Sequence, residues 1–79
     1  MAAVNQSVRI GVDIGGTFTD LALFDSDRKF RQYKSPSTPS DPSIGVFRVL
    51  EKAAQGLGVD IASMLSRVDT LVIGTTVAT

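Results

Sequence analysis

The chain has 79 residues, eight basic and eight acidic side chains, and neither cysteine nor histidine. This composition excludes a disulfide framework and an ordinary zinc site, because both need side chains that the sequence lacks. The balanced, interspersed charges provide no basic stripe for nucleic acid, and the longest apolar run is far shorter than the roughly 18–20 residues of a membrane span. We therefore expect a cytoplasmic protein that binds neither nucleic acid nor membrane.

The N-terminal half begins with two predicted strands joined by a glycine turn. Residues 1–7 are small and polar, which indicates a flexible N-terminus and not a signal peptide. Residues 8–14 alternate apolar and other side chains at the period of a strand. Residues 15–16 are both glycine, and residues 17–24 resume with β-branched and aromatic side chains. The end of this segment, residues 21–24, is apolar on both faces and is typical of a central strand covered from both sides.

The middle of the chain predicts an edge strand, a connector and the start of a helix. Residues 29–34 carry charges that suit an exposed sheet edge. Residues 35–40 are punctuated by prolines, which favour extended backbone. Asp41 then fits an N-cap position, and Pro42 fits the first helical position, where a missing N–H costs nothing.

The second half of the chain completes one strand–helix–strand unit. The apolar side chains at helical spacing, which we expect to face the core, are Ile44, Phe47, Leu50, Ala54 and Leu57. The helix should end at Gly56 or Gly58, and a short second helix is predicted over residues 60–66. Residues 70–73 predict a fourth strand, which ends at residues 74–76. A strand–helix–strand unit of this length implies a parallel crossover within a mixed α/β sheet.

The first strand and its glycine turn contain the residue types of a phosphate site. An unpartnered carboxylate in an apolar strand costs free energy to desolvate, so we expect Asp13 to face a cation or a cavity. Gly15 and Gly16 leave backbone N–H groups unobstructed, and such a turn can hold phosphate oxygens. Thr17 and Thr19 add hydroxyl donors on alternate residues, which a regular strand would present on one face.

Other interpretations of these residues stay open. A Gly-Gly pair between two apolar strands is also ordinary hairpin chemistry. Asp20, on the face opposite Thr19, is either a site residue or a solvated strand residue. Thr75 and Thr76 end a strand at the expected carboxyl edge of the sheet, where they either line a ligand site or cap a helix. The glycine turn is followed by a strand, which excludes a Walker loop and a dinucleotide fingerprint for this segment.

Three ordered segments carry a family resemblance. Residues 12–17 (VDIGGT) resemble the first phosphate motif of the actin/sugar-kinase/Hsp70 superfamily and alone fit a sugar kinase almost as well. The longer run 9–20 (RIGVDIGGTFTD) is more similar to the hydantoinase A/oxoprolinase family. So are residues 34–39 (KSPSTP), followed by Asp-Pro and Gly-Val, and residues 74–79 (GTTVAT). The family usually has a histidine before its Gly-Thr-Thr, where this chain has Ile73, and this departure puts any substrate-site role of that histidine in doubt.

The resemblance implies a fold, a cofactor and an activity. The fold would be the start of a ribonuclease-H-like mixed sheet in one lobe of an actin-like ATPase, with ATP and Mg²⁺ bound between two lobes. By position, Asp13 would hold the Mg²⁺ ion through water. The residues implied to contact the nucleotide are Gly15, Gly16, Thr17, Thr19 and Asp20. In this family ATP activates an amide or ketone oxygen by phosphorylation, which leads to opening of hydantoins or 5-oxoproline, or to carboxylation of ketones.

The length of the chain bears on these expectations. A two-lobed ATPase does not fit in 79 residues, so we expect residues 8–79 to be the N-terminal part of a longer enzyme and the isolated chain to be inactive. Its partners would be the remaining domains or a partner subunit, together with a small-molecule substrate. Two alternatives are a small-molecule kinase of the same superfamily and a non-catalytic structural or assembly segment.

Overall fold

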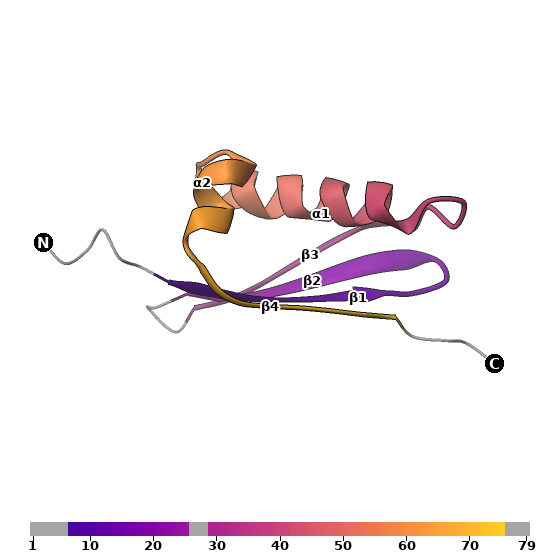
Figure 1. The fold of residues 1–79 in the computed structure, drawn as a ribbon, viewed down its shortest axis with the longest axis horizontal. Coiled ribbons are helices and arrows are strands. Elements are labelled where there is room, and N and C mark those ends of the chain that lie inside the picture. The colour runs from indigo at the N-terminus through magenta and orange to yellow at the C-terminus, as the bar shows by residue number, and fades with distance from the viewer. Residues whose placement is uncertain (1–6, 26–28, 76–79) are drawn as a thin grey trace, which may run out of the picture.

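A four-stranded mixed sheet with two helices on one face makes up the computed structural model, which describes residues 7–25 and 29–75 (Figure 1). In chain order the elements are β1 Val8–Ile14, β2 Phe18–Asp25, β3 Phe30–Pro36, α1 Pro42–Leu57, α2 Ile61–Ser66 and β4 Val68–Thr75. The strand order across the sheet is β3-β2-β1-β4. The pairs β1–β2 and β2–β3 are antiparallel, whereas β1 and β4 are parallel. The predicted α/β fold, with a hairpin, an edge strand, a crossover helix and a fourth strand, is confirmed.

The core lies between the sheet and α1. The strands alternate between buried and exposed positions, so every second side chain points toward the helix. The buried apolar residues are Val8, Ile10, Val12, Leu21, Leu23, Val46, Val49, Leu50, Ala53, Ala54 and Met64. In Figure 1 both helices lie above the sheet, and no described element covers the face below it. We call this uncovered side the open face.

The ends of α1 follow the capping pattern expected from the sequence, and α2 begins one residue later than predicted, after its own cap. The Asp41 carboxylate accepts a hydrogen bond from the Ser43 backbone N–H at 3.2 Å, and Gly58 closes α1 in the left-handed conformation with φ of 75°. Asp60 caps α2 by accepting from the Ser63 N–H at 2.7 Å. That hydrogen bond stabilises the charged carboxylate and lowers the pKa of Asp60.

The predicted core stripe of α1 is partly wrong. Phe47 is 59% exposed and Ile44 is 42% exposed, while the residues that α1 buries are Gly45, Val46, Val49, Leu50, Ala53 and Ala54. Both sets have helical spacing, so periodicity alone did not distinguish two adjacent stripes. The stripe that faces the sheet is rich in small residues, because they let the helix backbone approach the strands closely.

Further differences concern the boundaries of three strands and the coverage of one. β2 begins one residue later than predicted, β3 extends to Pro36 through two residues of the expected connector, and β4 starts at Val68. β2 is an interior strand, as expected, but described elements cover only one of its faces. The predicted flexible N-terminus lies outside the described residues except for Ser7, so it stays a prediction. Neither described helix is long and apolar enough to cross a membrane.

Candidate functional site

The turn between β1 and β2 contains two glycines that the fold treats differently. The Gly15 N–H donates to the Phe18 carbonyl at 3.0 Å and closes the turn. A Cβ on Gly15 would lie 2.9 Å from that same carbonyl oxygen, which excludes a side chain there. A Cβ on Gly16 would meet no atom within 4 Å, and Gly16 does not have a positive φ. The described part of the chain therefore gives no reason for glycine at position 16.

Ser37 sets the direction of the turn's peptide groups. Its backbone N–H donates to the Thr17 carbonyl at 2.8 Å, and its hydroxyl donates to the Gly15 carbonyl at 2.7 Å. In a planar trans peptide the carbonyl and the following N–H point in opposite directions. The Gly16 N–H therefore points away from Ser37, and no carbonyl of the described residues accepts a hydrogen bond from it. This leaves the Gly16 N–H as a backbone donor without a carbonyl acceptor among the described residues.

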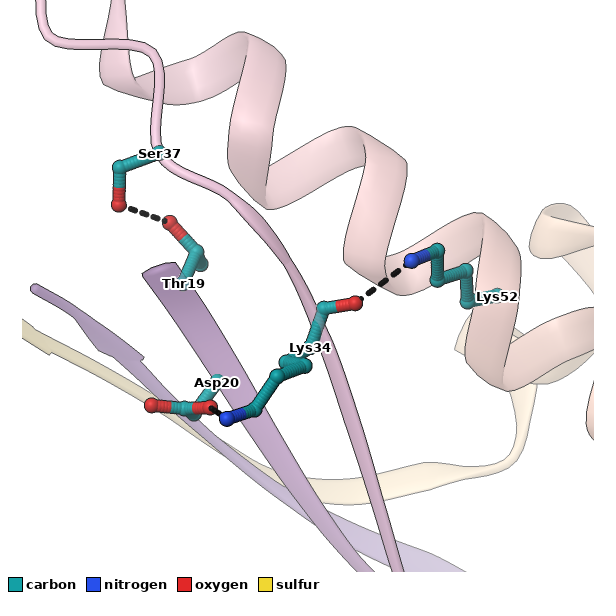
Figure 2. Close-up of polar contacts among 5 residues, drawn as sticks. All are labelled: Thr19, Asp20, Lys34, Ser37 and Lys52. Atoms are coloured by element: carbon teal, nitrogen blue, oxygen red, sulfur yellow. Dashed lines mark hydrogen bonds and ion pairs between the residues drawn. The ribbon is translucent and has the colours of Figure 1, made fainter. Parts of the chain in front are cut away.

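A row of charged side chains crosses the open face beside the turn. In the sheet register Asp13 lies opposite Asp20, and Asp20 lies opposite Lys34. The Lys34 ammonium nitrogen is 4.0 Å from an Asp20 carboxylate oxygen, as Figure 2 shows, and 5.0 Å from the centre of the Phe18 ring. Like charges on directly opposed residues destabilise a sheet, and the adjacent ammonium offsets this repulsion.

These charges stand at one end of a hollow on the open face. Its volume is about 630 Å³. The residues that line it are Gly11, Val12, Asp13, Asp20, Leu21, Ala22, Gln32, Tyr33, Lys34, Val72 and Gly74. Asp13 lines this hollow and is exposed, so its carboxylate faces a cavity and not a packed core, as expected from the sequence. Its position follows from strand alternation, which turns residue 13 away from the helices.

Thr17 and Thr19 do not lie in one strand, contrary to the prediction. β2 begins at Phe18, so Thr17 belongs to the turn, where it is exposed. Thr19 is fully buried on the helix side, where its hydroxyl lies 3.0 Å from the Ser37 hydroxyl (Figure 2). Thr19 therefore supports the turn from inside the molecule and is not available for direct contact with a phosphate. Asp20 lies on the opposite face from Thr19, as expected.

The carboxyl end of β4 lies beside the turn. β1 and β4 are parallel, so they end at the same edge of the sheet, where Thr75 pairs with Ile14 and Gly74 pairs with Asp13. Thr75 is exposed, and Thr76 lies outside the described residues. Gly74 is thus the β4 residue next to Asp13, and a Cβ there would meet nothing within 4 Å.

Sequence reasoning does not identify the contacts of two residues in this arrangement. It places Ser37 in a connector, and it favours a solvated edge-strand charge over a phosphate role for Lys34. The resemblance over residues 34–39 was a signal for both, but their contacts depend on the strand register and on the path of the connector across the turn. Neither the strand register nor the path of the connector leaves a periodic pattern in the sequence.

Comparison with known proteins places the chain in a family. Residues 9–79 match the family model described as the hydantoinase/oxoprolinase N-terminal region. The chain belongs to this family. The structure also aligns with the nucleotide-free structure of an acetone carboxylase, solved to explain ATP-dependent acetone carboxylation. The TM-score is 0.80 at 30% identity, over 90% of this chain and 10% of the other.

Hydantoinase/oxoprolinase relatives of known activity include two enzyme subunits. The alpha subunit of caprolactamase from Pseudomonas jessenii is 40% identical over 73 residues, which is 92% of this chain and 10% of the relative. The gamma subunit of acetophenone carboxylase from Aromatoleum aromaticum is 40% identical over 70 residues, 87% of this chain and 9% of the relative. The chain thus spans about a tenth of the length of these relatives.

Proposed function

We propose that this chain is the phosphate-binding segment of an ATP-dependent enzyme that activates an amide or ketone oxygen by phosphorylation. The observation that carries the proposal is Gly16, whose N–H points away from Ser37 and donates to no carbonyl of the described residues, at a position where the fold itself does not require glycine. A glycine without a local structural reason is best explained by the close approach of a ligand to the backbone. Phosphate oxygens are the ligands that outward-facing backbone N–H groups bind.

The residues around the turn fit a nucleotide phosphate chain with Mg²⁺. The Gly16 N–H and the exposed Thr17 would donate to phosphate oxygens, while Gly15 closes the turn. Mg²⁺ in nucleotide sites is usually held by one or two carboxylates, waters and the phosphates themselves. Asp13 would hold the ion through water, and Asp20, which pairs with Lys34, lies opposite it in the sheet. When bound, ATP would supply the phosphoryl group that makes a carbonyl carbon electrophilic or traps an enol.

The relatives support this reaction class through what their substrates share. Caprolactam is a cyclic amide, and acetophenone and acetone are ketones. Both groups have a carbonyl oxygen that ATP could phosphorylate. On the amide this would make the carbonyl carbon electrophilic, and on the ketone it would trap the enol, whose α-carbon forms the new bond. A segment common to amide-opening and ketone-carboxylating enzymes would therefore serve the ATP-dependent step rather than recognition of one substrate. We infer that this chain likewise serves the ATP-dependent step, and that other parts of a longer enzyme or a partner subunit bind the substrate.

Asp13→Asn in the enzyme that contains this chain tests the proposal. Removal of one charge without a change of shape should lower ATP-dependent turnover by roughly 10²–10³-fold, the usual effect of losing one well-placed electrostatic group at a reacting centre. Turnover would be followed as ADP release with a cyclic amide and with a ketone plus bicarbonate. Asp69→Asn, an exposed carboxylate near the other end of β4, is the matched control and should keep wild-type rates.

Three results would contradict the proposal in different ways. Near-wild-type turnover of the Asp13→Asn enzyme at saturating Mg²⁺ would remove the metal role of Asp13. A stable phosphorylated substrate as the final product would support a small-molecule kinase. Absence of ATP binding by the wild-type enzyme would leave a structural or assembly role for the segment.

A further inference from the structure

Ser37 makes three hydrogen bonds at the glycine turn although it belongs to a different part of the chain. It lies in the connector between β3 and α1. In two of them Ser37 is the donor: its hydroxyl donates to the Gly15 carbonyl at 2.7 Å, and its backbone N–H donates to the Thr17 carbonyl at 2.8 Å. The third joins its hydroxyl to that of Thr19 at 3.0 Å, the upper contact in Figure 2. Residues separated by about twenty positions in the chain thus meet at one point.

The direction of these bonds follows from the number of protons available. A serine hydroxyl carries one proton, and that of Ser37 is donated to the Gly15 carbonyl. The Thr19 hydroxyl must therefore donate to the Ser37 oxygen. Thr19 is fully buried and has no access to water, so this bond satisfies a group that would otherwise be costly to bury. The result is a relay from Thr19 through Ser37 to Gly15, in which each bond polarises the next.

The connector that carries Ser37 is itself fixed to α1. The Thr38 hydroxyl donates to the Asp41 carbonyl at 2.6 Å and accepts from the Gly45 N–H at 2.9 Å. A Cβ on Gly45 would lie 3.3 Å from the hydroxyl oxygens of both Thr19 and Thr38. Glycine at this position lets the first turn of α1 rest directly on the hydroxyl cluster, so Ser37 is held from both sides.

We propose that Ser37 is a positioning residue for nucleotide phosphate, an inference that rests on the proposed function. By holding the carbonyls of Gly15 and Thr17 on the inner side of the turn, Ser37 keeps the Gly16 N–H on the outer side. Without the hydroxyl, the peptide between Gly15 and Gly16 is free to rotate, and the donor is aimed at phosphate for only part of the time. Ser37 acts through this peptide and does not contact the nucleotide.

The test compares Ser37→Ala with Thr19→Val in the enzyme that contains this chain. Ser37→Ala removes the hydroxyl that donates to the Gly15 carbonyl. Thr19→Val removes the hydroxyl that donates to Ser37, with little change in side-chain volume. Ser66→Ala is the matched control, because the Ser66 hydroxyl also donates to a backbone carbonyl, that of Ser63, at 2.7 Å but in α2. Affinity for MgATP and for adenosine is measured by calorimetric titration. Hydrogen exchange of the peptide 14–19 is measured in the nucleotide-free protein.

Ser37→Ala should weaken MgATP binding roughly fivefold, the effect of one net hydrogen bond, with adenosine affinity unchanged because adenosine has no phosphates. Thr19→Val should have a smaller effect of the same kind, and both should accelerate exchange in residues 14–19. Ser66→Ala should change none of these quantities. Faster exchange with unchanged MgATP affinity would overturn the positioning role while the proposed function stands. A wild-type enzyme that binds no MgATP would overturn both.

Discussion

The glycines around Asp13 differ in whether the fold itself requires them. Gly15 is explained by the Phe18 carbonyl, which leaves no room for a side chain. At three other glycines a Cβ would meet open space, and all three lie near Asp13. Gly11 is in the same strand, Gly16 is in the turn that follows, and Gly74 pairs with Asp13 from β4. The sequence predicted Asp13 and the glycine turn correctly as one locality, because these residues are neighbours in the chain.

The charge row on the open face yields a prediction about Lys34. Lys34→Met in the enzyme should weaken MgATP binding several-fold, because two opposed carboxylates without the ammonium repel the anionic phosphates. If Lys34 acts by balancing Asp20, the double variant with Asp20→Asn should recover most of the affinity. Arg48→Met, which removes a positive charge from an exposed position on α1, should have no effect.

A double variant that binds MgATP as weakly as Lys34→Met alone would contradict charge balancing and indicate direct contact between Lys34 and a phosphate. The titrations should be carried out at two salt concentrations. The difference between Lys34→Met and the wild type should shrink at high salt, because both charged groups are more than half exposed and screened by ions.

At the scale of elements, the presence of the strands, the order of the elements along the chain and the caps of α1 were predictable from the sequence. The packing of side chains was not. Alternation at period two identified β1, and the Asp-Pro pair located the start of α1 to the residue. The face that α1 buries was predicted correctly at Leu50 and Ala54 but wrongly at Phe47, which belongs to an adjacent stripe with the same spacing. The Thr19 contact with Ser37 also escaped prediction, since it depends on where β2 begins and on how the connector crosses the turn.

The contact between α1 and β3 yields a stability prediction. The Tyr33 ring packs over Gly56, and a Cβ on Gly56 would collide with the Tyr33 hydroxyl and ring. Gly56→Ala should therefore accelerate hydrogen exchange in the last turns of α1, although alanine favours helices by about 1 kcal/mol over glycine. In a Tyr33→Ala background the same substitution should slow exchange, because only the helix propensity remains. If Gly56→Ala changed the exchange rate in the same direction with and without the Tyr33 ring, the ring would not be what requires glycine at position 56.

At the scale of the whole molecule, we propose that the chain supplies only part of a nucleotide site. The turn, Asp13 and the end of β4 converge at one edge of the sheet, while the hollow and β4 present apolar side chains to the surface. The chain spans about a tenth of its relatives, so the remaining contacts to ATP and to the substrate would come from other segments. The resemblance leads to the same expectation, and it does not define the substrate.

The central claim is that the glycine turn contacts nucleotide phosphate, and Gly16→Val in the enzyme tests it most directly. Open space around position 16 and a φ that is not positive should leave the fold and the melting temperature unchanged. The valine side chain would then occupy the space of the phosphate, so calorimetric titration should show MgATP affinity reduced at least tenfold, with adenosine affinity retained. A Gly16→Val enzyme that binds MgATP with wild-type affinity would place the phosphates elsewhere and contradict the account.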